Sequence, residues 1–383
     1  MKVIIIGPAW PLRGGLASFD QRLCRAFMET GNDCSIYSFS LQYPGFLFPG
    51  TTQFSSDPPP EGIRILPAIN SVNPFNWLFI GNRLKKEAPD LIVVRYWLPF
   101  MGPALGTILR RVRRNRKTKI VAITDNVLPH EKRFGDRPFT KYFLAGCDAY
   151  ITMSDAVMDD LRKFEKTKAA KRVIHPLYDN FGEIISKASA REWLREHRRL
   201  PIGPDDKIIL FFGFIRKYKG LDILIRAMAE PVLENTGIRL LVAGEYYGDR
   251  ESYIHLIGSL DIEKRLILKT DFIPDAEVRY YLCAADAVIQ PYRHATQSGV
   301  TPLAYHFEKP MVVSNVGSFA EHVLDEKTGL VTEAEPAALA KAILRFYELG
   351  EQYFIPHLRE EKKKYSWKNL VNTILDLSHD IQK

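Results

Sequence analysis

The chain of 383 residues is long enough for two domains, each with its own hydrophobic core. Its 46% hydrophobic and 26% charged residues are typical of globular proteins and exclude a disordered, collagen-like or coiled-coil chain. The formal charge of +8 is uneven, because residues 1–186 hold 26 Lys and Arg against 17 Asp and Glu, whereas residues 187–383 hold 27 against 28. The excess of positive charge therefore lies in the N-terminal half.

The four cysteines and the N-terminus exclude further classes of protein. The cysteines form no Cys-x-x-Cys pair, so we expect reduced thiols rather than disulfides or a zinc site. The N-terminal Met-Lys-Val-Ile-Ile-Ile-Gly lacks the cleavage site of a signal peptide, and no apolar run reaches the roughly 20 residues of a membrane span. We therefore expect a cytoplasmic protein.

Strand-like and helix-like segments alternate along the first half of the chain. Lys2–Gly7 is a β-branched run that ends in glycine, and Ala17–Thr30 has apolar residues at helical spacing before Gly31. Pro44–Pro60 contains Pro-Gly and Pro-Pro-Pro and predicts a long surface loop. Further strands are predicted at Cys34–Phe39, Leu91–Arg95, Ile120–Ile123 and Ala149–Met153. Apolar runs of this kind are typical of buried parallel strands.

The same alternation resumes after a charged stretch at residues 165–205, and we predict a domain boundary near residue 180. The strands of the second series are predicted at Lys207–Phe212, Arg239–Ala243, Leu266–Lys269, Ala287–Gln290 and Pro310–Ser314. The pattern therefore predicts an α/β protein with two Rossmann-like parallel-sheet domains, at residues 1–180 and 181–365. Ligands of such sheets bind at the carboxyl ends of the strands, so the loops at these ends are candidate sites.

Two of these loops combine glycine with groups that suit a phosphate. Gly14 and Gly15 precede a helix, where a glycine backbone can approach a phosphate closely, although a flexible turn explains them equally well. Phe212–Gly220 follows a strand and carries Arg216 and Lys219, two cations that suit a diphosphate. A solvated basic turn is the alternative for this second loop.

Two further loops follow predicted strands of the second half. The loop Tyr292–Val300 offers small polar side chains and backbone amides that suit an anion, unless it is an ordinary helix cap. Its candidate binding groups are Gln297, Ser298, Gly299 and Val300. Glu245 follows another strand end and is a candidate contact to a nucleoside, for which an ordinary polar loop is an equally good explanation.

Several segments resemble glycosyltransferase family 4 and stand in the order typical of that family. They are Phe212–Asp222, Leu241–Gly244, Lys309–Gly317 with Glu321, Lys327–Val331 and Tyr365–Trp367. The resemblance implies the GT-B architecture, with two facing Rossmann-like domains and a helix at residues 366–383 that crosses back to the first domain. It also implies sugar transfer from a nucleotide-sugar co-substrate, with retention of anomeric configuration and without a cofactor or metal. The sequence contains no Asp-x-Asp, in agreement with metal independence.

The resemblance assigns roles to residues of the second half. Lys219 matches the lysine of the family that binds the donor diphosphate. Phe214 stands where the family has an arginine, so we expect Arg216 to supply the guanidinium group. Ala295 and Leu303 stand where two glutamates are usual, one near the donor ribose and one near the sugar, so we expect other groups to make these contacts.

The first half departs from the family at the strand end Val121–Asp125. Asp125 stands where many members have an active-site histidine, and His130 follows five residues further on. We expect one of these two side chains to orient the acceptor hydroxyl or to take its proton. The alternatives are that Asp125 caps a turn and that His130 is a surface residue.

These features predict a hexosyltransferase of cell-surface polysaccharide synthesis that moves a sugar from a UDP- or GDP-sugar to a glycan or lipid-linked acceptor. A catalytically degenerate subunit that only binds a nucleotide-sugar is the alternative, because the usual glutamates and histidine are replaced. The basic run Arg110–Lys119 favours a peripheral contact with an anionic membrane, at the inner face of the cytoplasmic membrane, although a solvated helix end explains it equally well. No nucleic-acid partner is expected, because no nucleic-acid-binding motif is present.

Overall fold

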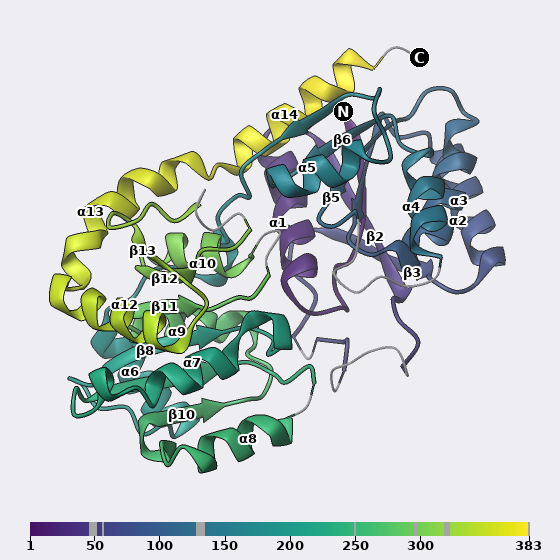
Figure 1. Cartoon of the computed structure of the whole chain (residues 1–383). Helices are drawn as coiled ribbons and strands as arrows, with labels where there is room; N and C mark the ends of the chain where they lie inside the picture. The colour runs from purple at the N-terminus through teal and green to yellow at the C-terminus, as the bar shows by residue number, and fades with distance from the viewer. Residues whose placement is uncertain are drawn as a thin grey trace. The chain divides into compact units, whose positions relative to one another are not determined.

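The structure is a computed structural model that describes residues 1–45, 52–55, 57–127, 135–248, 250–294, 298–317 and 322–381. Internal contacts divide the chain into two compact units. The N-terminal unit comprises residues 1–176 and 366–383, and the C-terminal unit comprises residues 177–365. Each unit is a parallel β-sheet with flanking helices, and the two are described separately below (Figure 1).

The N-terminal unit contains a seven-stranded parallel sheet in the order β3-β2-β1-β4-β5-β6-β7. Its strands are β1 (Lys2–Ile6), β2 (Asp33–Leu41), β3 (Arg64–Asn70), β4 (Leu91–Tyr96), β5 (Lys119–Thr124), β6 (Ala149–Thr152) and β7 (Ala170–Arg172). Its helices are α1 (Gly15–Glu29), α2 (Pro74–Glu87), α3 (Gly102–Arg113), α4 (Asp136–Leu144), α5 (Asp155–Arg162) and α14 (Trp367–Asp380). The central strands are buried throughout, as expected for a sheet covered on both faces.

The last helix, α14, belongs to the N-terminal unit although it follows the C-terminal unit in the chain. Ser366 caps its first turn by accepting a hydrogen bond from the amide of Asn369. The ring centre of Trp367 lies 4.8 Å from that of Phe19 in α1, and the guanidinium carbon of Arg22, also in α1, lies 5.3 Å from the centre of the indole ring. Aromatic packing therefore attaches α14 to α1.

The C-terminal unit contains a six-stranded parallel sheet in the order β10-β9-β8-β11-β12-β13. Its strands are β8 (Lys207–Phe212), β9 (Ile238–Ala243), β10 (Leu266–Lys269), β11 (Ala287–Gln290), β12 (Met311–Ser314) and β13 (Gly329–Thr332). Its helices are α6 (Lys187–Arg198), α7 (Leu221–Met228), α8 (Arg250–Ser259), α9 (Val278–Ala284), α10 (Val300–His306), α12 (Pro336–Leu349) and α13 (Glu351–Glu361). The central strands β8 and β11 carry the loops in which we predicted binding groups.

The apolar runs predicted the central strands but missed three strands at sheet edges. The predicted bounds of β8, β10 and β11 are confirmed, whereas β3, β7 and β13 were not predicted. Each of these three has a partner on one side only, and their residues are largely half-buried or exposed. Their sequences depart from the pattern of a buried strand: β7 reads Ala-Lys-Arg, and the apolar run of β3 contains a proline.

Candidate functional site

Lys219 lies just beyond the carboxyl end of β8, in a single 3₁₀ turn, η4 (Lys217–Lys219). Its side chain is buried, with 9% of the residue exposed. Gly213 has a φ of 92°, and a Cβ at this position would lie 3.2 Å from Nζ of Lys219. The ring of Tyr292 lies on a neighbouring loop, with its centre 5.7 Å from Nζ. Glycine at position 213 therefore leaves room for the ammonium group.

The ammonium group of Lys219 has no acidic partner among the residues that the structure describes. Burial, together with repulsion from Arg216, lowers the pKa of Lys219 to about 7. Burying a cation without a counter-charge costs folding free energy, and a bound anion would remove this cost. The end of β8 is therefore a candidate anion site, as the sequence predicted.

Arg293 joins this loop to the loop that follows β11. Its guanidinium group donates two hydrogen bonds to the carboxylate of Asp222, at 2.7 and 2.6 Å, and its backbone amide donates to the carbonyl of Tyr218 at 2.8 Å. Gly220 makes the approach possible, because a Cβ there would lie 1.9 Å from the carbonyl oxygen of Pro291. The two loops are thus held as one rigid element beside Lys219. The sequence analysis assigned no role to Arg293. The only feature of the sequence that pointed to a basic partner was Asp222, at the end of the Phe212–Asp222 motif.

The predicted groups of the β11 loop are used largely within the loop itself. The hydroxyl of Ser298 donates to the side-chain oxygen of Gln290 at 2.7 Å and accepts from the amide of Val300 at 3.2 Å. Gly299 lies against Tyr178, so that a Cβ would come within 3.4 Å of the ring. Gln297 lies outside the described residues. In this structure, therefore, Ser298 and the Val300 amide already have internal partners.

Arg216 and Glu245 lie on two loops that pair with each other. The amide of Ile215 donates to the carbonyl of Glu245 at 2.8 Å, and the Glu245 side chain is buried. Arg216 is exposed, and its guanidinium carbon lies 5.0 Å from the ring centre of Tyr247. Phe214, which stands where the family has an arginine, stacks on the same ring at 4.2 Å. The structure therefore places Arg216 at the rim of the site and Lys219 inside it.

The glycine pair of the N-terminal unit lies at the start of α1. Gly14 has a φ of 101°, which favours glycine, and α1 begins at Gly15. The neighbouring loop is held by a segment from the predicted surface loop: the amide of Arg13 donates to the carbonyl of Gln53, and Leu12 forms a bridge with Phe54. The residues just before Gly14 are therefore held in place by contacts with Gln53 and Phe54.

Asp125 follows β5 and forms a buried ion pair with Arg95 of β4. Both carboxylate oxygens accept from the guanidinium group, at 2.5 and 2.6 Å, and Asp125 is only 4% exposed. Asp20 of α1 lies 3.7 Å from the same guanidinium group, and burial raises the pKa of Asp20 well above its usual range. This arrangement favours a structural role for Asp125. His130 lies outside the described residues, and a catalytic role for either residue stays a prediction.

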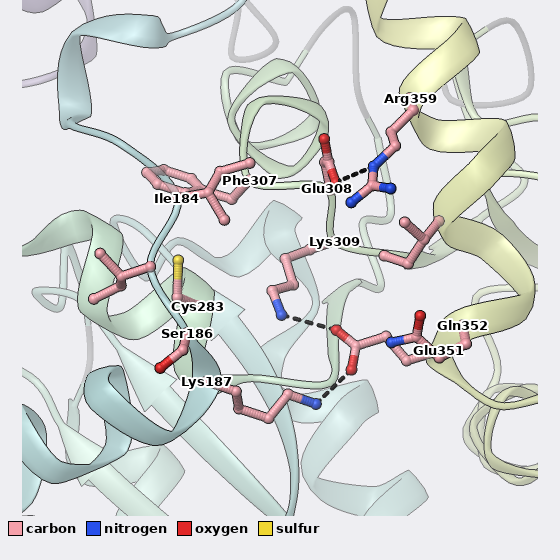
Figure 2. A pocket seen from close by; sticks show the side chains of 12 residues that line it. Ile184, Ser186, Lys187, Cys283, Phe307, Glu308, Lys309, Glu351, Gln352 and Arg359 are labelled. Atoms are coloured by element: carbon pink, nitrogen blue, oxygen red, sulfur yellow. Dashed lines mark hydrogen bonds and ion pairs between the residues drawn. The ribbon is translucent and has the colours of Figure 1, made fainter.

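A cavity of about 370 Å³ lies at the opposite, amino-terminal edge of the C-terminal sheet, as Figure 2 shows. Its charged groups are paired within the wall: Glu351 accepts from both Lys187 and Lys309, and Glu308 accepts from Arg359. Lys309 precedes β12, whereas Lys219 follows β8, so the cavity is separate from the candidate anion site.

Neither a metal cluster nor a membrane-spanning helix is found in the described part of the chain. No three His, Cys, Asp or Glu side chains in this part are placed so that they could hold a metal ion. No described helix has the length and hydropathy that crossing a bilayer requires.

The two Rossmann-like parallel sheets define a class of α/β protein in which ligands bind at the carboxyl ends of the strands. A family profile described as "Glycosyltransferase Family 4" matches residues 13–180, and one described as "Glycosyl transferases group 1" matches residues 206–348. The chain belongs to glycosyltransferase family 4 and is a glycosyltransferase.

Similar proteins of known sequence or structure cover nearly the whole chain. An uncharacterized glycosyltransferase of Methanocaldococcus jannaschii is 23% identical over 98% of this chain and 97% of its own. A D-inositol 3-phosphate glycosyltransferase of Corynebacterium urealyticum is 24% identical over 75% of this chain and 70% of its own. Anabaena HepE, solved in complex with UDP-glucose, has a TM-score of 0.74 and 16% identity over all of both chains. The predicted GT-B fold is confirmed.

Replacing Lys219 should stabilise the protein in the absence of a ligand. The pKa of Lys219 is about 7 when folded and about 10.5 when unfolded, so the unfolded state holds the proton between these values and stability rises with pH across this window. In Lys219→Met the free-energy cost of burying the charged ammonium group disappears. Each unit by which folding lowers the pKa of Lys219 corresponds to about 1.4 kcal/mol of this cost. We expect a higher unfolding temperature for this variant at pH 6.5, with a gain that shrinks towards pH 10.

The exposed neighbour Lys217 provides the control for this measurement. Lys217→Met removes the same charge from solvent and should leave the unfolding temperature nearly unchanged. Thermal unfolding of both variants at several pH values tests the burial argument. A Lys219→Met variant that is less stable than the parent at pH 6.5 would contradict it.

Breaking the Arg293–Asp222 pair should weaken ligand binding although neither residue is a proposed ligand contact. Asp222→Asn loses the charge that holds both guanidinium nitrogens, a contact worth on the order of 1 kcal/mol in a partly exposed pair. We expect the affinity for a nucleotide diphosphate, measured by calorimetry, to fall by several-fold. Asp271→Asn changes the same charge in an exposed pair and should not alter it.

Proposed function

We propose that this protein transfers a sugar from a UDP- or GDP-sugar to a glycan or lipid-linked acceptor, with retention of anomeric configuration and without a metal ion. The observation that carries the proposal is the buried Lys219 at the end of β8, which has no acidic partner among the described residues and lies between two loops that Arg293 joins. The complex of HepE with UDP-glucose supports a nucleotide-sugar as the donor. The proposed setting is polysaccharide synthesis at the inner face of the cytoplasmic membrane.

In this proposal the diphosphate of the donor lies against Lys219, with Arg216 at the rim. As the glycosidic bond breaks, negative charge builds on the leaving diphosphate, and a preorganised cation in a buried site stabilises this charge more than water would. Because Lys219 is already held in place by Gly213 and Tyr292, little reorganisation is needed during the reaction. The acceptor attacks the sugar from the face that the diphosphate leaves.

A catalytically inactive nucleotide-sugar-binding subunit is the second candidate, and we do not favour it. Such a subunit would use the buried Lys219 in the same way, so an assay of sugar transfer or donor hydrolysis by the purified protein separates the two candidates. The full-length similarity to a glycosyltransferase of Methanocaldococcus jannaschii supports an enzyme.

A stability screen with nucleotides of different bases tests the proposed donor. UDP-glucose, GDP-glucose and ADP-glucose share one sugar, so a difference in stabilisation reports the base alone. A ligand at about 100 times its dissociation constant stabilises a protein by roughly 2.7 kcal/mol, which is readily measured as a rise in unfolding temperature. The absence of stabilisation by all three, with or without EDTA, would refute a nucleotide-sugar donor.

Donor binding should weaken above pH 7. The anionic diphosphate prefers protonated Lys219, and the pKa of Lys219 in the free protein is about 7. At higher pH the ligand must bind together with a proton, so the dissociation constant should rise by about tenfold per pH unit between pH 8 and pH 10. Calorimetry at pH 8 in buffers of different ionisation enthalpy should show uptake of one proton. A dissociation constant independent of pH across this range contradicts the role of Lys219.

Lys219→Ala should reduce turnover on the order of 10²-fold, as the loss of one preorganised contact to a developing charge does in other enzymes. Because the variant is expected to fold at least as stably as the parent, the loss would not reflect unfolding. Sugar transfer or donor hydrolysis provides the assay, and Lys217→Ala is the matched control. Near-normal turnover in Lys219→Ala would remove the residue from the reaction.

A further inference from the structure

Two phenylalanines on helix α2 of the N-terminal unit are unusually exposed. Phe75 is 82% exposed and Phe79 is 64% exposed, the two highest values among the large hydrophobic side chains described. They lie four residues apart and therefore share one face of the helix. The opposite face contributes Ile80 and Leu84 to the core, so α2 has two apolar faces, only one of which is covered within its unit. A contiguous exposed apolar surface of this kind marks a site of interaction.

The same layer of helices carries a cluster of cations. Helices α2 and α3 pack side by side (Figure 1). Gly81 of α2 lies against the side chain of Arg111 of α3. Arg114, just after α3, and Lys86, near the end of α2, are exposed, whereas Arg113 pairs with Asp148 and donates to the carbonyl of Ala145. Neither helix contains an acidic residue apart from Glu87, the last residue of α2, which is paired with Lys2. The surface therefore combines exposed aromatic rings with positive charge.

This combination fits an anionic lipid surface better than a second copy of the chain. In a symmetric dimer the same patch would face itself, so that the two cation clusters would repel each other. A bilayer with anionic lipids offers negative charge to the arginines and lysines, and an apolar interface in which phenylalanine rings are buried. The lack of acidic side chains along both helices removes repulsion from such a surface.

We propose that α2 and the end of α3 form a membrane-binding surface, on which Phe75 and Phe79 enter an anionic bilayer while Lys86 and Arg114 contact its lipid headgroups. The proposal rests on the membrane-bound acceptor of the proposed function and names the side chains that reach the bilayer. The charge of the sequence indicated only the basic run Arg110–Lys119. The exposed phenylalanines lie on a different helix, α2. Binding therefore has two contributions. Salt screens the electrostatic attraction of the cations but not the burial of the aromatic rings.

Vesicle binding of the full-length protein and three variants tests the proposal. The vesicles contain phosphatidylcholine alone or with one third phosphatidylglycerol, at low and high salt. Phe75→Ser/Phe79→Ser should weaken binding to the anionic vesicles by about 10-fold, because two rings lose their burial. Lys86→Glu/Arg114→Glu should abolish most of the salt-sensitive part. Tyr353→Ser, at an exposed aromatic residue of α13 in the other unit, is the control and should bind like the parent.

The outcomes separate this proposal from the alternatives and from the proposed function. Unchanged unfolding temperatures and unchanged stabilisation by the nucleotide-sugar show that a variant is folded and that its donor site is intact. Equal binding of the parent to neutral and anionic vesicles, no binding to either, or full binding by Phe75→Ser/Phe79→Ser would each overturn the proposal. A dimer that the same phenylalanine substitutions convert to a monomer, without vesicle binding, would assign the surface to a second copy instead. Failure of donor binding with vesicle binding retained refutes only the proposed donor function.

Discussion

The loops at the carboxyl edge of the C-terminal sheet enclose one cation, Lys219, that has no acidic partner among the residues that the structure describes. Lys219 is covered by the turn that carries it, by Gly213 and by the ring of Tyr292, and no carboxylate in the described residues compensates its charge. A protein interior disfavours such a group, as the lowered pKa of Lys219 shows. The surrounding fold must therefore provide the free energy that keeps the ammonium group in place. An enzyme gains from this arrangement only when an anion completes the site.

Short backbone contacts hold together the two loops that follow β8 and β11. The Arg293 amide and the Tyr218 carbonyl pair across the loops, and Gly220 lies directly against Pro291. Any side chain at position 220 would collide with that carbonyl group, so the contact needs glycine. The bidentate pair of Arg293 and Asp222 then fixes the angle between the loops. Position and charge of the site are thus set before a ligand arrives.

The sequence predicted features that lie within one continuous segment. It missed contacts that depend on which strands pair and in which register. Lys219 and the bounds of β8 followed from an apolar run and a motif, both of which are continuous in the chain. The partner of Asp125 could not be predicted, because Arg95 is brought to it only by the pairing of β4 with β5. For the same reason Asp125 suggested a catalytic group, whereas the structure shows a carboxylate engaged on both oxygens by a buried guanidinium group.

The two edges of the C-terminal sheet differ in how their charges are compensated, and this difference indicates which edge accepts an anion. At the amino-terminal edge, Lys187 and Lys309 share Glu351, so the cavity there has no cation without a partner among the described residues. An anion that entered it would have to break one of these pairs. At the carboxyl edge, Lys219 has no acidic partner among the described residues, and an anion would gain its attraction without breaking a pair with any of them. A cavity whose charges are already paired is therefore a poorer guide to a candidate anion site than a buried cation of this kind.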